Sequence, residues 1–284
     1  MSAALGPFAE LVARDERRID LARACLLIAE DAYPGLEIDR YVGEIERLAL
    51  RLRARLPAQC DAEGMVVALN RYLFDDLGYR GNDDDYYDPR NSYLNEVIDR
   101  RTGIPITLSV VYLEVGRRIG LPLEGVSFPG HFVVRMRLRG GMLVLDPFAA
   151  GAPLDQEELR ARLRRVIPPA ASAPIPLDEL PLEQFLEPAG SRQILARILR
   201  NLKGIYRDAG QPERMLAVLD RMLVVDPQAH AELRDRGLLY QRLEAHRAAL
   251  RDIAAYLERA PDAPDAGEMR ARMVELAGIC ARLN

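Results

Sequence analysis

Two residues that act together in acid–base chemistry stand near each other in the middle of this chain of 284 residues. His131 follows the turn Pro129-Gly130 at the head of one predicted strand, and Asp146 stands near the end of the next. A carboxylate that accepts a hydrogen bond orients an imidazole, which can then take a proton from a nucleophile. In thiol hydrolases the nucleophile is a cysteine at a helix N-terminus, where the helix dipole and free amides favour the thiolate.

The helix that could present a nucleophile to this pair has no cysteine at its start. Residues Ile106 to Ile119 are apolar on nearly all sides, which predicts a central, buried helix. Pro105 stands at its N-terminus, with Thr107 and Ser109 just inside. A hydroxyl there would need His131 as a true base. We expect both hydroxyls to hydrogen-bond the helix backbone instead.

The distance between His131 and Asp146 depends on the hairpin that joins their strands. A two-residue loop of Gly140-Gly141 would set Asp146 opposite Arg135, about 13 Å along the strand from His131. A four-residue loop of Arg137 to Gly140 would set His131 directly opposite Asp146. The sequence leaves both registers open. We expect the pair to hold two strands together rather than to catalyse a reaction.

The elements that must position these residues change character along the chain. The first 80 residues read as helices with apolar stripes, and Asp155 can cap a further helix from Gln156 to Arg165. Between them, alternating β-branched segments predict short strands over Gly125–Phe128, His131–Arg137 and Met142–Phe148. Six prolines from Pro168 to Pro188 predict an extended connector.

A repeat begins after residue 191. Leu199, Leu202, Tyr206, Leu219 and Pro227 are matched 34 residues later by Leu233, Arg236, Tyr240, Ile253 and Pro261. This period, with an aromatic residue and a closing proline in fixed places, is typical of tetratricopeptide repeats. The sequence therefore predicts an α+β domain over 1–166, a Pro-rich connector over 167–190 and an all-α repeat tail over 191–284.

Composition and charge argue against several classes of function. The formal charge is −4, and basic residues are interleaved with acidic ones, so we expect no nucleic-acid partner. The absence of a long apolar run predicts no membrane span, and the charged N-terminus predicts no signal peptide. Cys25, Cys60 and Cys280 are odd in number and far apart, which favours a reducing cytoplasm and small core residues over a metal site. The acidic turn 83–89 lacks the glycine and glutamate of a calcium loop. We expect no metal and no cofactor.

Three segments carry a resemblance to a known family. They read NSYLNEVIDRRTGIPITLSVVYLEVGRRIGLPLEGV, PGHFVVR and LDPF. With the repeat tail, they resemble the transglutaminase-like superfamily, which has a papain-like fold, and more narrowly the bacterial SirB-type proteins, which join such a domain to tetratricopeptide repeats. The resemblance implies a catalytic order of cysteine, histidine and aspartate. Counted back from Gly120-Leu121-Pro122, the cysteine falls at Pro105, while His131 and Asp146 occupy the other two places.

Three functional hypotheses follow. The first is a non-catalytic pseudoenzyme, with a relic His131–Asp146 pair and a repeat tail that binds a protein or peptide partner. The second is a hydrolase or acyl transferase of the amidase or protease kind. Its nucleophile would be Thr107 or Ser109, or a thiol of Cys25 or Cys60 brought to the pair. The third is a regulatory factor that binds a small acidic or amide ligand in the relic cleft.

Overall fold

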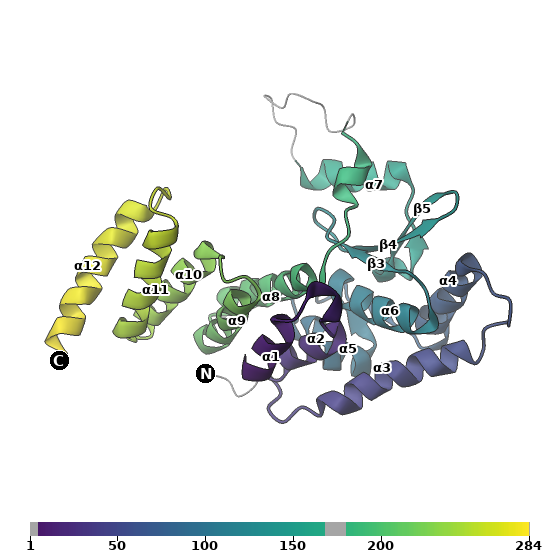
Figure 1. Ribbon diagram of the computed structural model, residues 1–284, viewed down its shortest axis with the longest axis horizontal. Coiled ribbons are helices and arrows are strands. Elements are labelled where there is room, and N and C mark those ends of the chain that lie inside the picture. The colour runs from purple at the N-terminus through teal and green to yellow at the C-terminus, as the bar shows by residue number, and fades with distance from the viewer. Residues whose placement is uncertain (1–4, 168–179, 284) are drawn as a thin grey trace. The chain divides into compact units, whose positions relative to one another are not determined.

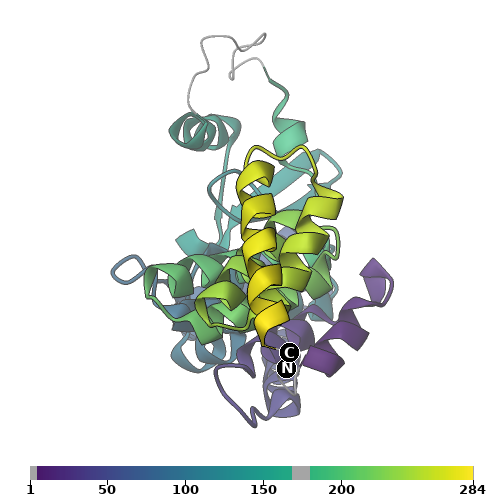
Figure 2. The ribbon, with the colours of Figure 1, turned by 90° about the vertical axis from the view of Figure 1, so that its left-hand side faces the viewer.

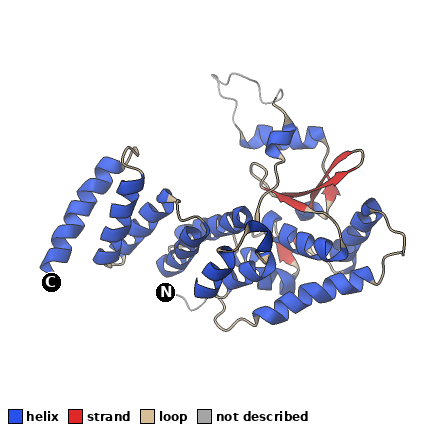
Figure 3. Ribbon diagram, viewed as in Figure 1, coloured by secondary structure: helices blue, strands red, loops and turns tan. Residues whose placement is uncertain are grey.

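The computed structural model describes residues 5–167 and 180–283, and these form two compact units. One unit contains the described residues between 14 and 198, and the other contains 5–13 and 199–283. Helices predominate over a small sheet, which confirms the predicted α+β class (Figure 3). None of the helices within the described ranges has the length and apolar character needed to cross a membrane.

The centre of the 14–198 unit is helix α6, Pro105–Ile119, in which every residue except Arg117 and Arg118 is buried. The predicted buried helix is thereby confirmed. Gly120 ends the helix at φ 101°, a left-handed conformation that glycine adopts without strain. Four other helices pack around α6 (Figure 1): α2 Leu21–Ala29, α3 Ile38–Arg53, α4 Ala62–Asn70 with its π-helical continuation η2 Arg71–Asp76, and α5 Leu94–Arg100.

Short 3-10 turns and a two-stranded ladder connect these helices. The turns are η1 Glu16–Arg18, η3 Pro89–Ser92 and η4 Pro147–Ala149. Strand β1, Arg80–Gly81, pairs in parallel with β2, Thr102–Gly103. This ladder brings the segment after η2 alongside the start of α6.

The main sheet has the order β3-β4-β5-β6 and is antiparallel throughout. Its strands are β3 Glu124–Val126, β4 Val133–Leu138, β5 Gly141–Asp146 and β6 Ala152–Pro153. The sheet lies between α6 and α7, Gln156–Val166, which begins with the predicted Asp155 cap (Figure 1). Both faces of the sheet are therefore covered, and the first four residues of β4 are all buried.

Both predicted hairpin registers are wrong. Leu138 pairs with Gly141, so the loop consists of Arg139 and Gly140. A sheet that is buried on one face fixes its register through polar and apolar alternation, but a sheet covered on both faces lacks that pattern. Here Val133 and Val144 pack toward α7, in the cluster that includes Leu159. For this reason the sequence could not select the register.

The last part of the predicted connector lies on the sheet. The 3-10 turn η6, Leu182–Phe185, and Leu186 join the apolar cluster under α7. The backbone N–H of Ala189 then donates to the carbonyl of Gly125 at 2.8 Å, which extends the sheet at the edge of β3. Residues 168–179 of the predicted connector lie outside the described residues.

The tail consists of paired helices, as the repeat predicts. They are α8 Ser191–Asp208, α9 Pro212–Val225, α10 His230–Arg242, α11 His246–Arg259 and the closing helix α12 Ala266–Arg282 (Figure 2). Gly237 permits a close crossing, because a Cβ atom there would lie 2.9 Å from Cγ1 of Ile253.

Helix α1, Leu5–Val12, packs on α9 of the tail unit, where the guanidinium of Arg221 lies 4.9 Å from the centroid of the Phe8 ring. The compact units thus divide the chain differently from the domains expected from sequence. The boundaries at 166 and 191 stay a prediction.

Candidate functional site

The structure brings His131 and Asp146 together. Asp146 is the last residue of β5, and its side chain is only 1% exposed. Its Oδ1 lies 2.9 Å from Nε2 of His131 and also accepts the backbone N–H of Phe148 at 3.0 Å. Its Oδ2 accepts from Nη2 of Arg162 at 2.8 Å. The carboxylate therefore has a nitrogen donor from each of three separate segments.

His131 reaches the carboxylate because of the turn before β4. Gly130 has φ 69°, and the backbone N–H of His131 closes the turn onto the carbonyl of Phe128 at 3.1 Å. Continuing the β4–β5 register by one residue sets Asp146 opposite Val133, two positions from His131 on the same face. An ionised carboxylate only accepts hydrogen bonds, so Nε2 donates and carries the proton. Among the described residues, Nδ1 of His131 has no hydrogen-bond partner.

Charge and hydrogen bonding decide the protonation of Asp146. Burial by itself would raise the pKa of this carboxyl. The hydrogen bond and charge of His131, together with those of Arg162, outweigh burial and hold the pKa of Asp146 below its ordinary value of 3.8. The carboxylate therefore stays ionised and keeps the imidazole oriented.

Sequence reasoning did not identify Arg162. It stands on α7 beside Leu163, which is fully buried in the sheet cluster. An arginine beside a buried leucine on an amphipathic helix is usually solvated, so no local signal distinguished it. Only the packing of α7 across β5 places its guanidinium on Asp146.

The start of α6 exposes neither of its two candidate hydroxyls, because Thr107 and Ser109 are both buried. Pro105 is its first residue and is buried. The Thr107 hydroxyl donates to the carbonyl of Asn91 at 2.7 Å and accepts from the backbone N–H of Ile104 at 3.1 Å, so it bonds the backbone as predicted. Ser109 is fully buried, but its hydroxyl has no hydrogen-bond partner among the described residues. The backbone bond expected for Ser109 is therefore not formed.

The acidic turn 83–89 shapes the surroundings of His131. Asn91 is fully buried, and its Nδ2 donates to the carbonyl of Asp85 at 2.7 Å, which fixes the turn. The turn presents Tyr86, whose ring meets that of Phe148 edge-on at 6.4 Å. The Phe148 ring in turn meets the His131 ring at 6.1 Å. The Phe148 ring therefore lies against the imidazole, and Tyr86 packs against Phe148. The tyrosine in the acidic run was the sequence signal for this arrangement.

The cysteines differ in their surroundings. Cys25 is buried in α2, and burial raises the pKa of its thiol, which disfavours the reactive thiolate. Cys280 is also buried, whereas Cys60 is half-buried next to the first turn of α4, so the expectation of three core cysteines is wrong for Cys60. Within residues 5–167 and 180–283, no three His, Cys, Asp or Glu side chains gather in a way that could hold a metal ion.

Comparison with known proteins supports both parts of the chain. The family model described as transglutaminase-like superfamily matches residues 39–200, and a tetratricopeptide repeat model matches 202–274. A UPF0162 protein of Xylella fastidiosa is 44% identical over 263 residues, which cover 93% of this chain and 92% of the relative. Protein SirB1 of Salmonella typhimurium is 27% identical over 235 residues, which cover 82% and 84%. Menin, a solved structure, aligns with a TM-score of 0.42 at 13% identity over 96% of this chain and 74% of its own.

The lowered pKa of Asp146 has a consequence for stability. At pH values between the lowered pKa of Asp146 and 3.8, the unfolded chain binds more protons than the native state. The stabilisation that ionised Asp146 contributes is therefore complete above pH 3.8 and is lost as the pH falls through this range. We expect Asp146→Asn to reduce the free energy of unfolding by about 3 kcal/mol at neutral pH. The difference should shrink below about pH 4. Urea unfolding at several pH values measures it. Asp84→Asn, at an exposed position, is the control and should change little.

Proposed function

The chain belongs to the transglutaminase-like superfamily, and we propose that it is a non-catalytic member that acts by binding a protein partner. The observation that carries this proposal is Pro105, which stands at the first position of the buried helix α6. A helix N-terminus lowers the pKa of a thiol and so creates a nucleophile. Proline has neither a thiol nor a hydroxyl, so this position can form no bond to a substrate.

The neighbouring hydroxyls do not replace the thiol. The Thr107 hydroxyl is used in the cap of α6 and in the bond to Asn91, so attack on a substrate would break two structural hydrogen bonds. Ser109 lies deeper in the helix and is fully buried. A substrate could reach it only if α6 moved out of the core.

A structural role explains why a histidine and an aspartate remain without the thiol. The Asp146 carboxylate joins the end of β5 to the turn before β4 and to α7. Removing a partner from a buried charge is costly even where no reaction occurs. This stabilisation supports the structural interpretation of the pair.

The tail supports the interaction role, because tetratricopeptide repeats generally mediate binding between proteins. Its helices are held in register by ion pairs across the stack. Arg236 of α10 donates to Asp220 of α9 at 2.7 Å and to Asp252 of α11 at 2.6 Å. A stack fixed in this way offers a preorganised surface to a peptide or helix.

The alternative is a hydrolase or acyl transferase with an unusual nucleophile. One observation favours it: the partnerless Nδ1 of His131 could accept a proton, because Nε2 is already engaged with Asp146. Cys60 is half-buried, so the rate at which a thiol reagent labels it is the first test of this alternative.

The first test separates stability from catalysis. We expect His131→Ala to lower the free energy of unfolding by about 2 kcal/mol, because Asp146 loses a donor in a buried setting. Hydrolysis of amide and ester substrates should be at background level in both proteins. Thermal melts and single-turnover assays measure the two effects. An unchanged melt combined with a lost hydrolytic rate would reverse the conclusion.

A second test asks whether position 105 is the place of the missing nucleophile. Pro105→Cys should place a buried thiol at the N-terminus of α6, and we expect iodoacetamide to label it faster at pH 7 than Cys25, a buried thiol whose pKa is raised by burial. The labelling rate should fall when His131→Ala is added. The hydrolase alternative gains support if Cys60 of the unaltered chain is instead the fastest-labelled thiol and if added substrate protects it from labelling.

A third test addresses partner binding. Val274 of α12 is 69% exposed, and Leu50 of α3 is 65% exposed, so they form a matched pair. We expect a photo-crosslinking amino acid at 274, introduced in living cells, to yield a discrete crosslinked protein that mass spectrometry identifies. The same residue at 50 should not yield this product. Equal products from both positions, or none from 274, would argue against a partner on the tail.

A further inference from the structure

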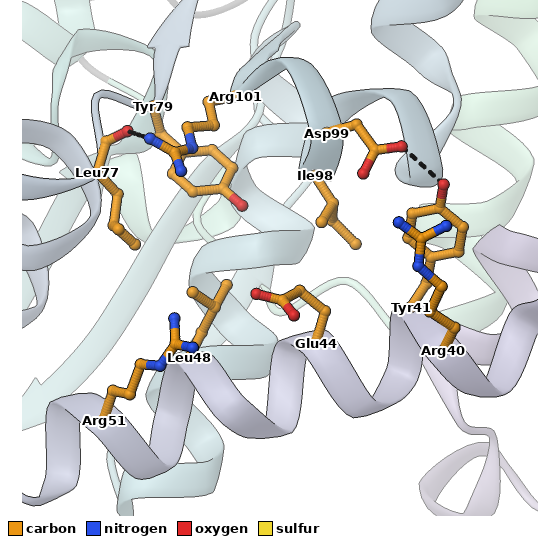
Figure 4. Close-up of a pocket in the computed structure, with 10 residues that line it drawn as sticks. All are labelled: Arg40, Tyr41, Glu44, Leu48, Arg51, Leu77, Tyr79, Ile98, Asp99 and Arg101. Atoms are coloured by element: carbon orange, nitrogen blue, oxygen red, sulfur yellow. Dashed lines mark hydrogen bonds between the residues drawn. The ribbon is translucent and has the colours of Figure 1, made fainter.

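A pocket of about 210 Å³ opens in the 14–198 unit, apart from His131 and Asp146. It lies over one face of α3 and is closed by the end of α5 and by the segment that follows η2 (Figure 4). Its lining is mainly polar and carries charges of both signs, and Leu48 of α3 and Ile98 of α5 contribute an apolar part. Pockets for drug-sized ligands measure roughly 300–1,000 Å³, so this one suits a smaller molecule.

Three arginines line the pocket: Arg51 and Arg101 at one end, and Arg40 at the other, where its guanidinium lies 5.1 Å from the centroid of the Tyr41 ring (Figure 4). Arg51 has no hydrogen bond or ion pair among the described residues. Arg101 donates from Nη1 to the carbonyl of Leu77 at 2.7 Å, which leaves its other N–H groups available. Arg101 also has the left-handed backbone conformation φ 56°, ψ 31°, which costs a non-glycine residue about 1 kcal/mol. The strained backbone at Arg101 therefore accompanies the placement of its guanidinium at the pocket.

The hydroxyl of Tyr79 points into the pocket from above (Figure 4). Tyr79 is only 5% exposed, and its hydroxyl makes no hydrogen bond to any described residue. Burial raises the pKa of this phenol, so it remains a donor. This hydroxyl is open to the pocket, where a bound oxygen atom could accept its hydrogen bond.

Two carboxylates face the remaining part of the pocket. Asp99 accepts the Tyr41 hydroxyl on Oδ2 at 2.6 Å, and Oδ1 has no partner among the described residues. Glu44 accepts both N–H bonds of Arg47 on Oε2, at 2.9 and 2.7 Å, and leaves Oε1 without one. These free oxygen atoms can accept hydrogen bonds from an ammonium group.

We propose that this pocket binds a free α-amino acid with an apolar side chain. Arg51 and Arg101 take the carboxylate, to which Tyr79 also donates. Glu44 and Asp99 accept from the ammonium group, and the side chain lies against the apolar part of the lining. Charges of both signs in the lining complement a zwitterion, and the volume of about 210 Å³ limits its size. This proposal does not depend on the absence of catalysis at His131, so the two can fail separately.

Titration calorimetry of the full chain with L-leucine, L-valine and L-methionine, one at a time, tests the proposal. We expect saturable binding of at least one of them. For leucine, the analogues 4-methylpentanoate and 3-methylbutylamine lack the ammonium and the carboxylate, and each should bind at least about tenfold more weakly. No saturable binding of any of the three amino acids would overturn the proposal.

Matched variants locate the binding. Arg51→Gln should weaken it at least about tenfold, because two charge-assisted hydrogen bonds are lost. Tyr79→Phe should weaken it about fivefold, since a single hydroxyl is removed. Arg53→Gln, at an exposed arginine of the same helix, should leave the affinity unchanged. Neither pocket variant removes a described contact, so the chain should still fold. Equal affinity in all three variants would place the binding elsewhere and overturn the proposal.

Discussion

The buried carboxylate of Asp146 is the constraint on which the arrangement of the site depends. A carboxylate that is 1% exposed must be surrounded by donors, because its desolvation is otherwise prohibitive. The donors come from the turn before β4, from Phe148 as the second residue of η4 and from α7. One charge therefore fixes the sheet against the helix that covers it, and it fixes the ring of His131 as well. Any ligand that approaches Nδ1 meets an imidazole that is already held.

At the start of α6, buried polar groups also find hydrogen-bond partners within the protein, but these groups are neutral. Proline suits the first position of a helix, because the backbone N–H that it lacks would have no partner in the helix. The Thr107 hydroxyl then serves Ile104 and Asn91 together, while the Asn91 side chain fixes the acidic turn. An enzyme of this kind would carry its nucleophile at the start of α6. Here that turn is linked to two other segments by hydrogen bonds. This design is consistent with our proposal that the fold binds rather than reacts.

Charge is used differently in the pocket over α3. At buried Asp146, and at half-buried Arg236 in the tail, each charge meets its partners within the protein. At the pocket, by contrast, Arg51 and Tyr79 have no partner among the described residues, and the carboxylates of Glu44 and Asp99 each keep a free oxygen. Unused hydrogen-bonding capacity that converges on a small cavity is the physical basis of our ligand proposal. The two sites therefore have opposite characters, one internally satisfied and the other open.

Local pattern was enough to determine much of this protein. The apolar run of α6, the cap at Asp155 and the 34-residue period all depend on local pattern, and the structure has the buried helix, the cap and the helical tail. The sequence also identified His131 and Asp146 as candidates, but it left their distance open. Tertiary structure decided the rest. The hairpin register could not be predicted because both faces of the sheet are buried, so alternation carries no information. Arg162 and the groups of the pocket reach their places only when separate helices pack, and no local signal in the sequence specifies contacts between segments so far apart.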